Sequence, residues 1–142
     1  MRMRLSLSLP RTAASVAVAR QTLDRIFAAF GVRTDCRQEI AMAVSEACTN
    51  AVRHAVGEPT YELLVHADDG ECVITVDDRS RASVVPAPRT MPPPTATAGR
   101  GLAIMSLTMD SVELNQGPTG GLLTRLVKSL RWNEGALGSL PP

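Results

Sequence analysis

The tripeptide Asp68-Asp69-Gly70 constrains the fold more than any other feature of the sequence. It separates two runs in which apolar residues alternate, Tyr61–Ala67 and Cys72–Asp77. An Asp-Gly step between two such runs is typical of the tight turn of a β-hairpin. We therefore expect an antiparallel pair of strands near the middle of the chain.

The other elements follow from apolar spacing, which repeats every second residue in strands and every three to four residues in helices. The spacing predicts strands over 5–9, 111–115 and 122–130 and helices over 13–30, 35–56 and 101–110. Residues 86–99 hold five of the ten prolines without periodicity, which indicates a loop or lid at about 86–100. We expect one α+β domain over 1–132, a two-layer sandwich with a mixed, mostly antiparallel sheet and helices on one face, followed by a flexible tail over 133–142.

Composition excludes several classes of function. The 142 residues carry 15 Lys+Arg against 14 Asp+Glu, and only 3% are aromatic, which argues against a nucleic-acid-binding protein. No apolar stretch is long enough for a membrane span. The three cysteines form no CxxC pair, so we expect them to be reduced and the protein to be cytoplasmic.

The helix predicted over 35–56 has one apolar and one polar face. Ile40, Val44 and Ala47 fall on the apolar face, whereas Glu46 and Asn50 lie one turn apart on the polar face. A carboxylate and a carboxamide oxygen in this relation can bind Mg²⁺ and a water molecule. On its own this pattern is also typical of an ordinary solvated helix face.

Two later motifs support a nucleotide site. The strand over 73–76 is followed directly by Asp77-Asp78, where a carboxylate can accept a hydrogen bond from an adenine amino group. After the proline-rich segment, Gly99-Arg100-Gly101 opens a helix, and glycines there let backbone N–H groups approach phosphate.

Three stretches together resemble the Bergerat-fold ATPases, and among these the small anti-sigma-factor serine kinases of bacterial partner switching. The stretches are EIAMAVSEACTNAVRHA (39–55), ITVDDRS (74–80) and GRGLAIMSLTMDSVEL (99–114). The resemblance covers nearly the whole chain, and SEACTNAVRHA is its most specific part.

The resemblance implies a role for each matching residue. Glu46 would be the general base, Asn50 the Mg²⁺ ligand and Asp78 the acid that reads adenine. We align Asp78 rather than Asp77 because Ile74 and Val76 alternate inward, which places Asp78 two residues further on the same face. The other residues expected to contact ATP are Arg53, His54, Ser80, Gly99, Arg100, Gly101, Leu102 and Thr124.

Two positions depart from the family pattern. Ser80 stands where the family has the first glycine of DxGxG, which adds a side chain close to the base. Gly121 is followed by Leu122 instead of threonine, and Thr124 comes later than the family threonine. We expect these changes to weaken nucleotide affinity.

The resemblance implies a homodimeric kinase that binds ATP and Mg²⁺, sequesters a sigma factor and phosphorylates a Ser or Thr of a STAS-type anti-anti-sigma antagonist. The alternative is a regulatory module of the same fold that binds a partner or a nucleotide without catalysis, and the altered adenine-side motifs favour it. A third option, the catalytic domain of a sensor histidine kinase, is not expected, because we find no phospho-accepting helix or sensor segment in the sequence.

Overall fold

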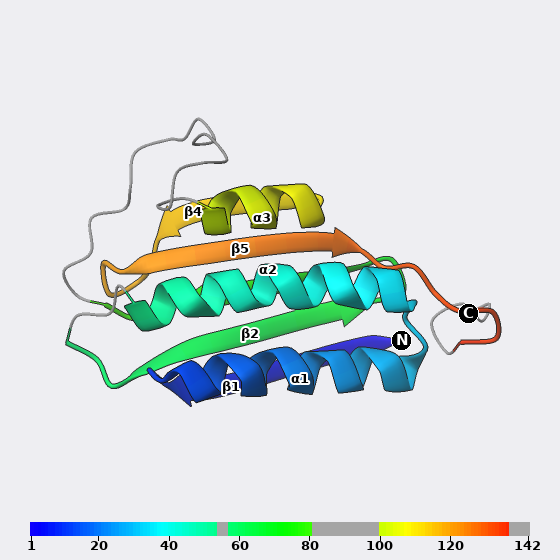
Figure 1. Ribbon diagram of the computed structural model, residues 1–142, viewed down its shortest axis with the longest axis horizontal. Coiled ribbons are helices and arrows are strands. Elements are labelled where there is room, and N and C mark those ends of the chain that lie inside the picture. Colours follow the sequence, from blue (N-terminus) through cyan, green and yellow to red (C-terminus); the bar gives the residue numbers. More distant parts are fainter. Residues whose placement is uncertain (54–56, 81–99, 137–142) are drawn as a thin grey trace.

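The computed structural model describes residues 1–53, 57–80 and 100–136. Its elements are β1 (Arg2–Pro10), α1 (Ala13–Phe30), α2 (Thr34–Arg53), β2 (Thr60–Asp68), β3 (Glu71–Asp77), α3 (Arg100–Thr108), β4 (Ser111–Gln116) and β5 (Leu122–Ser129). The strands form one sheet, and the three helices lie side by side on one of its faces (Figure 1). This confirms the two-layer α+β fold. Residues 86–99 of the predicted lid and 137–142 of the predicted tail lie outside the described residues.

The sheet has the order β1-β2-β3-β5-β4, and each of its four pairings is antiparallel. The sequence predicted a mixed sheet, but the described strands contain no parallel pair. The reason is that β5 lies between β3 and β4, which separates the two strands that run in the same direction. The β2–β3 hairpin turns where predicted, and Asp68 Oδ1 accepts hydrogen bonds from the backbone N–H groups of Gly70 (2.8 Å) and Glu71 (3.0 Å).

The core lies between the inner face of the sheet and one stripe of each helix. Ile40, Val44 and Ala47 of α2 are at most 2% exposed, as the apolar face of this helix predicts. In β2, Tyr61, Leu63, Val65 and Ala67 point inward in strict alternation. The three cysteines are buried and free. No helix among the described residues has the length and apolar character to cross a membrane.

The helix boundaries can be compared with the sequence predictions. Thr12 caps α1, and Gly31 ends it in the left-handed conformation with φ 94°. The described part of α2 ends at Arg53, so the predicted extension to Val56 falls on residues 54–56, outside the described part. The sequence placed the start of α3 at Gly101, and the described part of this helix already includes Arg100.

The opposite face of the sheet carries no helix of the described chain (Figure 1). Leu64, Val73 and Val127 lie on this outer face, where Val73 pairs with Val127 and each of the three is partly buried. An apolar strip of this kind is a candidate contact surface.

Candidate functional site

The polar face of α2 meets the first turn of α3. Glu46 and Asn50 are half-buried on α2, and Gly101 of α3 lies directly against them. A Cβ atom at Gly101 would lie 2.9 Å from Glu46 Oε2 and 3.6 Å from Asn50 Nδ2. The structure therefore brings together three residues that the sequence assigned to one site, and the glycine is needed for this close approach.

Neither Glu46 nor Asn50 makes a hydrogen bond or ion pair with another described residue. Their side chains are therefore free to contact water or a ligand. Carboxylate and carboxamide oxygens suit a hard cation such as Mg²⁺. The described residues contain no group of three or more His, Cys, Asp or Glu that could hold a metal ion. A cation at Asn50 would therefore depend on oxygens of a bound ligand as well.

A second group of residues forms where β3 ends. The carboxyl group of Asp78 is buried, with the residue only 2% exposed, and Oδ1 accepts hydrogen bonds from the backbone N–H groups of Ser80 and Leu122 (both 2.9 Å). With Oδ1 bound to the backbone, Oδ2 is the oxygen that we expect to meet a ligand. Asp77 lies on the other face and accepts a hydrogen bond from the Arg79 N–H (2.8 Å), so Asp78 is the one that lies on the inner face, as the alternation of Ile74 and Val76 predicts.

Gly121 closes the space around this carboxylate. A Cβ atom there would collide with Asp78 Oδ1 and lie 2.6 Å from the Ser80 carbonyl oxygen. Only glycine fits at this position. Thr124 is buried on the inner side of β5. It pairs with Val76 of β3, and Val76 precedes Asp78 by two residues. This places Thr124 beneath the Asp78 end of β3.

Ser80 stands out among the residues near Asp78. It is fully buried, and its Oγ has no hydrogen-bond partner in the described part of the chain. Its carbonyl oxygen accepts from Thr119 Oγ1 (3.2 Å), and the preceding Arg79 has the left-handed φ of 55° that non-glycine residues seldom adopt. A buried hydroxyl without a partner is a site where a bound molecule gains a hydrogen bond.

The remaining predicted residues fall into three groups. Arg53 and Arg100 are exposed at the end of α2 and the start of α3. Leu102 is half-buried and packs against the core. The predicted contacts His54 and Gly99 lie outside the described residues.

Arg11 is a residue that the sequence did not single out. Its guanidinium donates to the carbonyl oxygens of Glu58 (2.5 Å), Ala51 (2.7 Å) and Asp78. Burial lowers its pKa, and the nearby Asp78 and Glu58 carboxylates act in the opposite direction. Every residue has a backbone carbonyl, so no residue type or motif in the sequence predicts these contacts.

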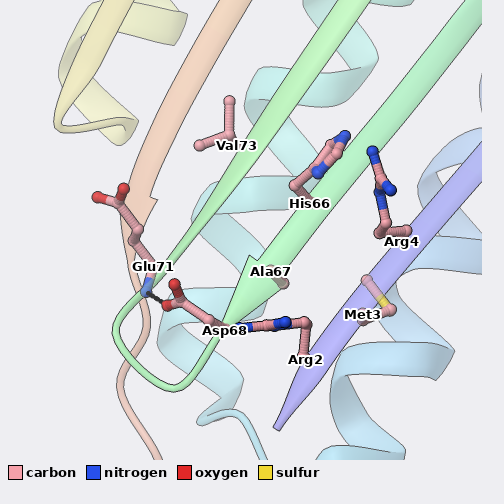
Figure 2. Close-up of a pocket in the computed structure, with 8 residues that line it drawn as sticks. All are labelled: Arg2, Met3, Arg4, His66, Ala67, Asp68, Glu71 and Val73. Atoms are coloured by element: carbon pink, nitrogen blue, oxygen red, sulfur yellow. Dashed lines mark hydrogen bonds between the residues drawn. The ribbon is translucent and has the colours of Figure 1, made fainter.

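The surface has two hollows of interest, and one of them adjoins the candidate site. One of about 280 Å³ opens beside Glu46 between α1, α2 and α3, and Met42 and Ile104 are among the residues that line it. Another of about 300 Å³ lies on the outer face of the sheet, where Arg4 and His66 stand side by side (Figure 2). The second hollow includes Glu71 at the opposite end of β3 from Asp78, so it is separate from the candidate site.

Comparison with known families agrees with this geometry. Residues 9–128 match the family model described as the histidine kinase-like ATPase domain. The chain belongs to this family. The matched segment includes both groups of site residues, those on α2 and those at the end of β3.

Curated members of the family give more detail. The chain is 34% identical over 102 residues to the anti-sigma F factor of Pasteuria penetrans, covering 66% of this chain and 68% of that one. It is 32% identical to the anti-sigma F factor of Halalkalibacterium halodurans (92% and 94% covered) and 29% identical to the serine-protein kinase RsbW of the same organism (92% and 85%).

Among solved structures, the fold matches that of the RsbU and RsbW domains of Rv1364c from Mycobacterium tuberculosis. The TM-score is 0.67 with 22% identity, over 90% of this chain and 32% of the longer chain. At this identity the match supports the fold alone.

Proposed function

We propose that this protein is an ATP-dependent serine kinase that binds a sigma factor and phosphorylates a small antagonist of the STAS type. The observation that carries the proposal is the contact of Gly101 with Glu46 and Asn50, whose polar groups have no partner in the described chain. The names of the relatives, anti-sigma F factor and serine-protein kinase, support the same activity.

The chain's own groups suit ATP at both ends of the molecule. Bound ATP would supply the phosphoryl group, and Mg²⁺ would supply positive charge that stabilises the phosphates. Asn50 would hold the cation through its carboxamide oxygen, and the first turn of α3 at Arg100 and Gly101 would direct backbone N–H groups at phosphate. At the other end, Asp78 would accept a hydrogen bond from the adenine amino group.

Glu46 would act as the general base. It would take the proton of the antagonist's serine hydroxyl as that oxygen bonds to the γ-phosphorus, while the bond between this phosphorus and the bridging oxygen breaks and ADP leaves. The hollow lined by Glu46, Met42 and Ile104 supports this role because it gives a substrate side chain access to the carboxylate.

The proposal includes a homodimer and a cytoplasmic location. The dimer was expected mostly from the family resemblance, with the apolar Leu5, Leu7 and Leu9 and the helical segment 16–30 as the support in the sequence itself. These three leucines lie on the core side of β1. The outer face with Leu64, Val73 and Val127 supports a dimer better, because no described helix covers it. A sigma-factor partner would place the protein in the cytoplasm.

The test uses labelled ATP and candidate antagonist proteins encoded in the same operon. Wild-type protein is expected to label one of them on a serine or threonine. The alternative, a binding module without catalysis, is favoured by Ser80 in the place of a family glycine. It predicts that an antagonist with demonstrated binding remains unlabelled, and that result would refute the kinase proposal.

A further inference from the structure

Arg11 follows β1 directly and joins three segments that are distant in sequence. Its Nε donates to the Glu58 carbonyl (2.5 Å), Nη1 to the Ala51 carbonyl (2.7 Å) and Nη2 to the Asp78 carbonyl. Its backbone N–H also donates to the Pro59 carbonyl (3.3 Å). The acceptors are 40 to 67 residues away along the chain. One side chain therefore ties together the end of α2, the segment before β2 and the end of β3.

Two of the three acceptors border the candidate site. Ala51 directly follows Asn50 near the end of the described part of α2. The third acceptor belongs to Asp78 itself. The guanidinium is a planar fork with fixed donor directions, so it sets the spacing of its acceptors more strictly than a lysine ammonium does. Arg11 thus connects the Asn50 end of the site with the Asp78 end.

We propose that Arg11 is a positioning residue that fixes the distance between Asn50 and Asp78, and thereby the fit of a nucleotide that must reach both. This inference rests on the proposed ATP site and extends it to a residue outside the nucleotide motifs. Arg11 itself contacts backbone carbonyls, so its effect on a nucleotide passes through the two residues that it holds in place.

The chain offers a matched control in Arg37. This guanidinium is also partly buried, and it donates to Asp24 Oδ1 (2.8 Å), the Val32 carbonyl (3.1 Å) and Thr34 Oγ1 (3.2 Å). Arg37 is 13 residues before Asn50 on α2, or about 20 Å along the helix. Its removal breaks as many hydrogen bonds without touching the site.

The first experiment measures Mg·ATP affinity by calorimetry well below the unfolding midpoint of each variant. Arg11→Met is expected to weaken binding by about tenfold or more, and Arg11→Lys by less, because lysine keeps the charge but loses the fork. Arg37→Met should lower the unfolding midpoint and leave affinity within about twofold of wild type. Equal ATP affinity in wild type and folded Arg11→Met would overturn the inference.

A second readout needs no nucleotide. The amides of Ser80 and Leu122 both donate to Asp78 Oδ1, so their hydrogen exchange reports how firmly Asp78 is held. In Arg11→Met and Arg11→Lys they are expected to exchange faster than global unfolding accounts for, whereas Arg37→Met should change them only in proportion to global stability. Unchanged local protection in both Arg11 variants would overturn the positioning role. If wild-type protein fails to bind ATP, the proposed function fails and this exchange measurement still decides the role of Arg11.

Discussion

The two halves of α2 differ in whether their acidic and amide side chains have partners among the described residues. In the first half, Glu39 forms ion pairs with Lys128 (2.9 Å) and Arg131 (2.5 Å), and Asp35 is 3.9 Å from Arg131. In the second half, Glu46 and Asn50 have no partner among the described residues. Both stretches belong to one helix, and Glu39 and Glu46 are seven residues apart, so they lie on about the same face.

Glu39 is bound by other residues of the chain and stabilises the fold, whereas we propose that Glu46 and Asn50 bind substrate and cation. Lys128 is almost fully buried, and besides pairing with Glu39 it donates to the Thr108 carbonyl (2.5 Å), which ties β5 and α2 to the end of α3. Its partners are all within the chain. Glu46 lines a hollow and lies against the first turn of α3, and its side chain has no partner among the described residues.

The largest expected effect is on phosphoryl transfer, and it is tested by replacing Glu46 and Glu39 with glutamine in separate variants. Glu46→Gln keeps size and hydrogen bonding but loses the proton acceptor, so phosphoryl transfer should fall by about 10²–10⁴-fold with ATP affinity and unfolding midpoint nearly unchanged. Glu39→Gln should lower the unfolding midpoint and leave the transfer rate of the folded protein intact. A kinase assay and a thermal melt on both variants check this. If the two variants lose activity equally, the comparison is wrong.

Lys128→Met should have the next largest effect, on stability. The substitution leaves Glu39 with Arg131 alone and removes a donor from the Thr108 carbonyl, and we expect a loss of about 2 kcal/mol. Urea unfolding measures it. Lys128→Arg keeps the charge and serves as the control. A stability equal to wild type in Lys128→Met would show that this network holds nothing together.

Ser80→Ala tests the unpaired hydroxyl at the functional end. Removing a buried hydroxyl that lacks a partner should stabilise the nucleotide-free protein by about 1 kcal/mol. Urea unfolding without nucleotide checks the sign. A loss of stability in Ser80→Ala would show that the hydroxyl is already satisfied, and it would remove this atom from the candidate site.

The smallest expected effect is the contribution of Glu39 and Asp110 to the pH dependence of stability. The hydrogen bond from Lys128, followed by that from Arg131, holds the pKa of Glu39 below the ordinary value of 4.5, and the Ser129 N–H lowers the pKa of Asp110. Lowered pKa values stabilise the ionised, folded form, so stability is full at neutral pH and declines as the pH falls below about 4.5 through the folded pKa values. Chemical unfolding at several pH values measures this. Glu39→Gln should decline less steeply than wild type, and equal slopes would contradict the assignment.

The sequence predicted the features that depend on local periodicity. The Asp-Gly turn, the apolar stripe of α2 and the inward alternation of Ile74, Val76 and Asp78 are written in residues close to one another, and the structure confirms all three. That Glu46 and Asn50 share one face of α2 also follows from their spacing of four residues. Their meeting with Gly101 followed from the family resemblance, since the two segments are about fifty residues apart.

Other features could not be read from the sequence because they depend on how distant segments pack. Arg11 acts on backbone carbonyls, which every residue has, so no residue type marks its partners. Ser80 was expected to crowd the base, but the sequence could not show that its hydroxyl is buried without a partner. Lys128 is a buried cation on the inner face of β5, and the position of its partner Glu39 on α2 could not be read from the sequence.

We propose above that Asn50, near the described end of α2, holds the Mg²⁺ of a bound nucleotide. Titration of the wild type with ATP, with and without Mg²⁺, tests it most directly beside the same titrations of Asn50→Ala. We expect the wild type to bind ATP with micromolar affinity that weakens when Mg²⁺ is removed. We expect Asn50→Ala to fold normally and to have the same ATP affinity with and without Mg²⁺. Equal Mg²⁺-dependent binding by the wild type and Asn50→Ala would contradict it.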